Sequence, residues 1–167
     1  MTTQTHKTKP DMKMNTLLKI TAALALAFAG QQTLRAHSDV KIGPNGGRVL
    51  EFSNNQTVHG EVIEKDGMFH IAVLDKDMKP IPIEKQTLTA TTGDRSKPEK
   101  LKVETKDGKF VTPIQKGGDH WTIFQFRETQ EAKPVTARLR YIAKACAECA
   151  KPDWLCECAM KNKTEKK

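Results

Sequence analysis

A β-hairpin is predicted by one continuous stretch, Thr57-Val-His-Gly-Glu-Val-Ile-Glu-Lys-Asp-Gly-Met-Phe-His-Ile-Ala-Val-Leu74. Its second half alternates, so that Phe69, Ile71 and Val73 share one face of a strand and the residues between them share the other. Asp66-Gly67, between the two halves, favours the positive φ angles of a two-residue hairpin turn. The stretch therefore predicts an antiparallel pair of strands with one buried face.

Further strands are predicted on both sides of this hairpin. They cover residues 48–52, 87–91, 101–105, 109–112, 120–126 and 135–141. Short turns rich in Gly and Asp separate several of them, at a spacing typical of all-β domains. We expect an immunoglobulin-like β-sandwich of seven to eight short antiparallel strands over residues 37–141, with an open β-barrel as the alternative.

Residues 1–36 have the pattern of a secretory signal peptide. A basic start precedes an apolar run from Ile20 to Gly30, and Ala36 supplies the small residue at a cleavage position. The run is shorter than the roughly 20 apolar residues that a membrane-spanning helix needs. We therefore expect a periplasmic or secreted protein with no membrane span after signal cleavage.

The charge of the chain is moderate once this segment is set aside. The whole sequence carries 28 Lys+Arg and 20 Asp+Glu, and residues 1–36 hold five of the basic and one of the acidic residues. The remainder therefore has a net charge of +4, which is ordinary for a soluble domain. The basic residues are scattered and do not alternate with aromatic ones, so we expect no nucleic-acid binding.

No arrangement of residues typical of an enzyme is found in the sequence. The Gly-rich stretch 43–47 lacks the lysine of a phosphate-binding loop, and no serine-hydrolase elbow or zinc-protease helix motif occurs. Cys146 and Cys149 form a Cys-x-x-Cys pair, but the alternating strand–helix pattern of thiol oxidoreductases is missing. We therefore expect a protein that is not an enzyme.

Three short motifs carry a resemblance to a known family. They are Gly43-Pro-Asn-Gly-Gly-Arg-Val-Leu-Glu51, His59-Gly-Glu61 and Leu74-Asp-Lys-Asp-Met-Lys-Pro80. In this order they resemble a small bacterial periplasmic β-domain family, which is similar to domains associated with heavy-metal efflux systems. The likeness covers about residues 37–142. It implies metal handling and a partner that is an efflux-system or envelope protein.

All four cysteines lie in the stretch Cys146-Ala-Glu-Cys149-Ala-Lys-Pro-Asp-Trp-Leu-Cys156-Glu-Cys158. Four thiolates this close can bind Zn²⁺ tetrahedrally, and Cu⁺ also suits ligation by sulfur alone. Cysteines of exported proteins more commonly pair as disulfides, and three pairings are open, among them Cys146–Cys158 with Cys149–Cys156. A metal-free, disulfide-stapled binding module of the cell envelope is therefore the alternative to a metal-binding accessory protein.

The cysteines belong to a predicted appendage, residues 142–167, which ends in a basic tail. Its first part, residues 142–150, is rich in alanine and favours a helix. Trp154 and Leu155 lie between the two cysteine pairs, and we expect them to cover the sulfurs or to dock the appendage on the sandwich.

Histidines provide a second set of candidate metal ligands. Cleavage after Ala36 would make His37 the N-terminal residue, whose amine and imidazole together chelate Cu²⁺. His59 is the first candidate to complete such a site, and His70 is the next. The predicted metal ligands are thus Cys146, Cys149, Cys156, Cys158, His37, His59 and His70, with Zn or Cu as the metal.

Overall fold

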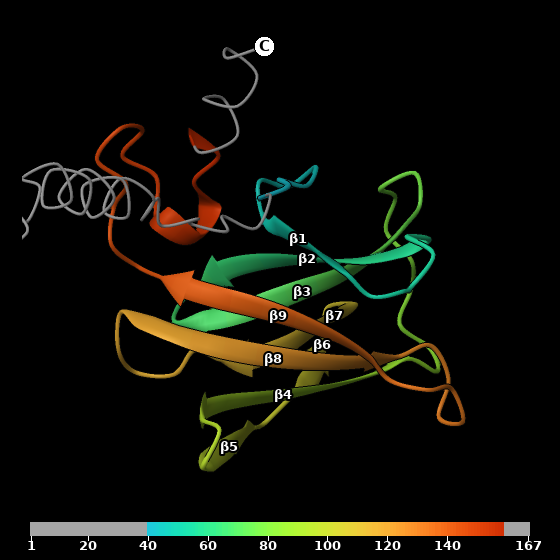
Figure 1. The fold of residues 1–167 in the computed structure, drawn as a ribbon. Helices are drawn as coiled ribbons and strands as arrows, with labels where there is room; N and C mark the ends of the chain where they lie inside the picture. The colour runs from blue at the N-terminus through green and yellow to red at the C-terminus, as the bar shows by residue number, and fades with distance from the viewer. Residues whose placement is uncertain (1–39, 159–167) are drawn as a thin grey trace, which may run out of the picture. The chain divides into compact units, whose positions relative to one another are not determined.

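The fold is an all-β sandwich of two antiparallel sheets, as predicted (Figure 1). The computed structural model describes residues 40–158. The predicted signal peptide, His37 and the basic tail after Cys158 lie outside the described residues, so the expectations placed on them stay predictions. No helix within the described range is long and apolar enough to cross a membrane.

The first sheet has five strands in the order β1-β2-β3-β7-β6. They are β1 (Arg48–Glu51), β2 (Val58–Lys65), β3 (Met68–Asp75), β7 (Lys109–Pro113) and β6 (Glu104–Lys106). The predicted hairpin is β2–β3, whose register pairs Val58 with Asp75 at its open end. Asp66 and Gly67 have φ angles of 53° and 72°, as a two-residue turn between right-twisted strands requires.

The second sheet has four strands in the order β5-β4-β8-β9. They are β5 (Lys97–Leu101), β4 (Thr87–Asp94), β8 (Asp119–Arg127) and β9 (Val135–Ile142). No hydrogen-bonded strand pair joins the two sheets in the described part of the chain. The arrangement is therefore a sandwich and not the alternative open barrel.

Aromatic rings fill the space between the sheets. Phe52 stacks on Phe126 with ring centroids 4.8 Å apart, and Phe69 meets Phe124 edge-on at 6.3 Å. All four rings are almost fully buried. Burial of this apolar area is the main force that holds the sheets face to face.

One predicted strand, residues 101–105, is wrong. β5 ends at Leu101 in the second sheet, and β6 begins at Glu104 in the first, so the chain changes sheets within the predicted strand. Leu101 and Val103 both pack against the core, which explains the alternation in the sequence. The described chain consequently has nine strands instead of seven to eight.

The alanine-rich stretch after β9 does not form the expected helix. The amide of Cys146 donates to the carbonyl of Lys151, and the amide of Asp153 donates to that of Lys144, as in a small hairpin. A 3₁₀ turn, η1 (Asp153–Leu155), follows. Helix propensity is a weak preference that these hydrogen bonds and the burial of Trp154 override.

Candidate metal centre

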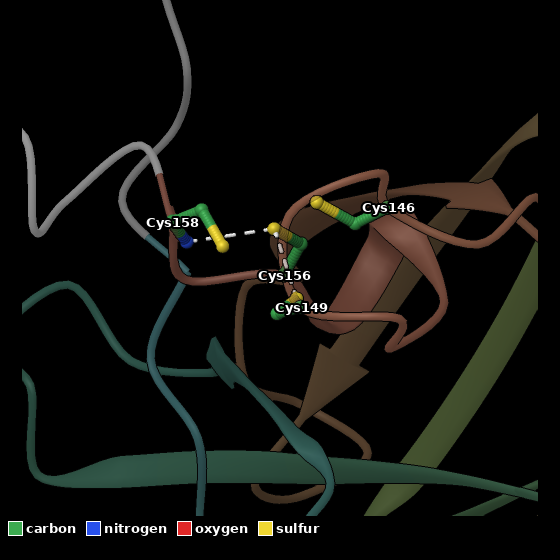
Figure 2. A group of neighbouring side chains, drawn as sticks. All are labelled: Cys146, Cys149, Cys156 and Cys158. Carbon is green, nitrogen blue, oxygen red and sulfur yellow. Dashed lines mark hydrogen bonds between the residues drawn. The ribbon is translucent and has the colours of Figure 1, made fainter.

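The four cysteines lie on what we call the Cys segment, residues 143–158, which Figure 1 shows in red and orange beyond the end of β9. Its hairpin places Cys146 and Cys149 in one tight turn, where the amide of Ala150 donates to the carbonyl of Cys146. The turn η1 then redirects the chain and returns Cys156 and Cys158 to the first pair (Figure 2). Local backbone geometry thus gathers ligands from both ends of the segment.

The sulfur atoms of Cys146, Cys149, Cys156 and Cys158 all lie within 4.8 Å of one another. The sulfurs of Cys149 and Cys156 are 3.7 Å apart. Four thiolates at about 2.3 Å from a tetrahedral Zn²⁺ would be separated by about 3.8 Å. The donor set and its spacing therefore fit a metal ion of the Zn²⁺ or Cu⁺ class with small adjustments.

The disulfides that the sequence also allowed are not formed in this structure, where all four cysteines are free thiols. The thiol of Cys149 donates a hydrogen bond to the sulfur of Cys156 at 3.7 Å, a distance far beyond the roughly 2.05 Å of a disulfide. Four sulfurs meet at one place because the chain brings them there, without a covalent bond between any two of them.

Backbone amides and neighbouring thiols act in opposite directions on the cysteines. The amides of Glu148 and Cys149 lower the pKa of Cys146 to about 7, because they donate to its sulfur. The pKa of Cys158 is raised, chiefly because hydrogen bonds with the thiols of Cys156 and Cys149 favour its protonated form. The group thus favours one thiolate and resists further ones, which a bound cation would reverse.

Cys156 lies between these two influences. The amide of Cys158 donates to its sulfur at 3.4 Å and lowers its pKa, but burial and the thiol of Cys146 outweigh that effect and the net pKa is raised. Cys149 is exposed, while the other three are half-buried. The centre therefore lies at the surface, within reach of a metal ion in solution.

Trp154 connects the centre to the sandwich. Its side chain is 2% exposed and contacts Phe69 and Tyr141, with ring centroids 6.1 and 5.7 Å away. The backbone oxygen of Trp154 accepts a hydrogen bond of 3.1 Å from Nη1 of Arg48 in β1. Burial lowers the pKa of that guanidinium. The expectation that Trp154 docks the segment on the sandwich is thus confirmed.

Two of the predicted histidine ligands, His59 and His70, do not belong to this centre. His59 of β2 pairs with Leu74, and His70 of β3 pairs with Ile63. The two histidines lie on the same outer face of the first sheet, but they are four residues apart along the strand direction, or about 13 Å. Nδ1 of the buried His59 lies 2.9 Å from the carboxylate of Glu51. Among residues 40–158, the cysteines form the only group of His, Cys, Asp and Glu that could hold a metal ion.

A second polar site, which the sequence did not reveal, explains two of the motifs behind the family resemblance. The carboxylate of Glu61 is fully buried and accepts hydrogen bonds from the amide of Asn45 at 2.8 Å, its Nδ2 at 2.7 Å and the amide of Gly47 at 3.1 Å. A Cβ on Gly43 would lie 2.6 Å from the Glu61 carboxyl, so this close approach requires glycine. The Gly-rich loop and the His-Gly-Glu strand are two halves of one structural contact, in which Asn45 donates two hydrogen bonds to Glu61.

The third motif is a turn. Oδ1 of Asp75 accepts hydrogen bonds from the amides of Asp77 at 2.9 Å and Lys79 at 2.8 Å. The Lys79 amide is the main reason why the pKa of Asp75 lies below its usual value. This motif therefore connects β3 to the following segment and offers no separate site.

Comparison of the chain with protein-family models, curated proteins and solved structures gave no match. The resemblance to efflux-associated domains consequently stays an expectation from sequence.

Proposed function

We propose that this protein is an exported metal-binding accessory protein that holds one Zn²⁺ or Cu⁺ ion at its four cysteines. The observation that carries the proposal is the convergence of the sulfurs of Cys146, Cys149, Cys156 and Cys158 within 4.8 Å. Four soft donors gathered at the surface, on a segment with a single buried side chain, are chemically suited to a thiophilic metal.

Zn²⁺ is the first candidate for this centre. A tetrahedral set of four sulfurs is typical of zinc, and the separation of 3.7 Å between Cys149 and Cys156 is close to the edge of such a tetrahedron. Cu⁺ is the second candidate, since all-sulfur ligation selects it as well. A bound ion would supply positive charge that stabilises all four thiolates.

The cellular setting is proposed from the sequence. The signal-peptide pattern of residues 1–36 supports export to the periplasm or outside the cell. The resemblance of residues 37–142 to domains associated with heavy-metal efflux supports a role beside an efflux-system or envelope protein. In that role the protein would bind metal in the envelope and act without catalysing a reaction.

Native mass spectrometry of the reduced protein, with Zn²⁺ or Cu⁺ supplied at micromolar concentration, tests the proposal. We expect one metal ion to be retained, and replacement of all four cysteines by serine to abolish retention. The double variant His59→Gln and His70→Gln is the matched control and should keep the metal. A reduced protein that retains neither metal would rule the function out.

The contact between Cys149 and Cys156 favours a second candidate, a disulfide-stapled binding module without metal. Export would expose the thiols to an oxidising compartment, where structural cysteines usually pair. Thiol titration of protein isolated from its own compartment separates the two functions. Four reactive thiols, or four thiols released by a chelator, would exclude the stapled module.

A further inference from the structure

Trp154 is the only fully buried residue of the Cys segment. Most of the segment is exposed, and the cysteines other than Cys149 are half-buried. Besides this side chain, hydrogen bonds from Arg48 to the Trp154 oxygen and from the amide of Ala143 to the carbonyl of Gly118 join the segment to the sandwich. The segment is therefore attached to the sandwich chiefly through the Trp154 ring, beside which the half-buried Leu155 also packs against the core.

That ring lies on a loop whose ends are the metal ligands. Cys149 precedes Trp154 and Cys156 follows it, and their sulfurs are 3.7 Å apart. A metal bound to both would close the loop and confine Trp154 to a small volume, whereas without a metal only a weak contact between two thiols holds the ends of the loop together. One buried side chain must otherwise offset the conformational entropy of the whole segment.

A cavity of about 300 Å³ lies beside Trp154. Pro152 and Leu155 of the Cys segment line one side, and Gly46, Gly47 and Glu64 line the other. Part of the boundary between the segment and the sandwich is thus a pocket that solvent can reach. Behind Trp154 lie Phe69 and Tyr141, whose hydroxyl donates to the carboxylate of Glu64 at 2.9 Å.

We infer that a metal ion bound at the four cysteines keeps Trp154 buried in the core. Loss of the metal releases Trp154 together with the Cys segment and opens the aromatic end of the sandwich at Phe69 and Tyr141. Metal occupancy is thereby converted into a change of surface that a partner could detect. The inference rests on the proposed function, because it requires the cysteines to bind metal.

The two tryptophans of the chain provide the test. Trp154 is buried and Trp121 is 52% exposed. The variant Trp121→Phe therefore has the buried Trp154 as its single tryptophan, and Trp154→Phe has the exposed Trp121. Acrylamide quenching is measured on both variants with Zn²⁺ and after chelation under reducing conditions, with zinc content followed by mass spectrometry. We expect quenching of Trp154 to be weak with zinc, to rise to the level of Trp121 after chelation, and to reverse when zinc is restored. The Trp121 signal should not respond.

Hydrogen exchange of β2 and β3 shows whether the opening is local. Protection of these strands should persist after chelation while that of residues 143–158 is lost. If the protein binds zinc but Trp154 is quenched equally before and after chelation, the inference is overturned and the proposed function stands. Loss of protection throughout the sandwich would also overturn it, because the metal would then hold the entire fold. Failure to retain zinc would refute the proposed function and the inference together.

Discussion

The two polar sites of this protein differ in what completes them. The loop at Asn45 and Gly47 surrounds the Glu61 carboxylate with three hydrogen-bond donors, so the buried charge is stabilised by the chain itself. The Cys segment brings four sulfurs together without a covalent bond among them. Hydrogen bonds among the thiols raise the pKa of Cys158 and so favour its protonated form. A site that the chain completes serves the fold, whereas a site that the chain leaves incomplete is available to a ligand.

The largest effect on metal binding is expected at the incomplete site. Replacing Cys149 by serine removes one of four soft donors, and we expect zinc affinity to fall at least about a hundredfold, beyond the usual effect of losing an outer-sphere partner. Competition with a chromophoric chelator measures the affinity. His70→Gln, on the outer face of β3, should leave it unchanged. Equal affinities in the wild type and Cys149→Ser would show that the two sites do not differ as described.

Truncation of the side chain that connects the two regions should come next. Trp154→Ala removes a ring that is 2% exposed, and we expect a loss of about 3–5 kcal/mol in the free energy of unfolding of the zinc-loaded protein. Urea unfolding measures it. Trp121→Ala, at a position 52% exposed, is the control and should change stability by about 0.5 kcal/mol or less. Similar losses in both variants would contradict the docking role of Trp154.

A smaller loss is expected at the completed site. Glu61→Gln keeps the size of the side chain but removes the carboxylate that accepts three hydrogen bonds. We therefore expect the free energy of unfolding to fall by about 1.5–3 kcal/mol. Zinc binding should not change, since Glu61 is no part of the cysteine group. Glu99→Gln on the exposed strand β5 is the matched control for stability. A drop in zinc affinity in Glu61→Gln would show that the sites are coupled.

The smallest effect concerns an exposed ion pair at the end of the second sheet. Arg140 donates two hydrogen bonds to the carboxylate of Asp119, which lowers the pKa of Asp119. Because the folded-state pKa is the lower one, the pair stabilises the fold above the ordinary aspartate pKa and loses this contribution as pH falls through the lowered value. Arg140→Gln should raise the pKa of Asp119 toward its usual value in a carboxyl NMR titration. Arg138→Gln, two positions away on β9, should leave it in place.

Much of the sandwich could be predicted from residue patterns. Alternation identified the hairpin of β2 and β3 because the period of a strand is two residues and one face is buried. The same rule misplaced the strand around Leu101 and Val103, since alternation persists while the chain crosses from one sheet to the other. Only strand pairing, which depends on distant residues, separates the two cases.

The metal centre was predictable in part. Cysteine spacing predicted the four candidate sulfur ligands, because no other part of the sequence gathers soft donors so closely. His59 and His70 were plausible by residue type, but register sets them apart on the sheet, and that register depends on the whole hairpin. Burial of the Glu61 carboxylate by a loop 14 to 16 residues earlier could be suspected only from the glycines around it.

The sequence by itself determined the strand-rich character of the chain, the hairpin turn at Asp66-Gly67 and the concentration of sulfur in one short segment, because these depend on neighbouring residues. The tertiary structure decided which sheet each strand joins, that Asn45 and Gly47 bind Glu61, and that the sulfurs converge while Trp154 enters the core. Apart from the convergence of the sulfurs, which lie within one short segment, those contacts join residues far apart in the chain. Their free energy exists only once both partners have been brought together by the fold.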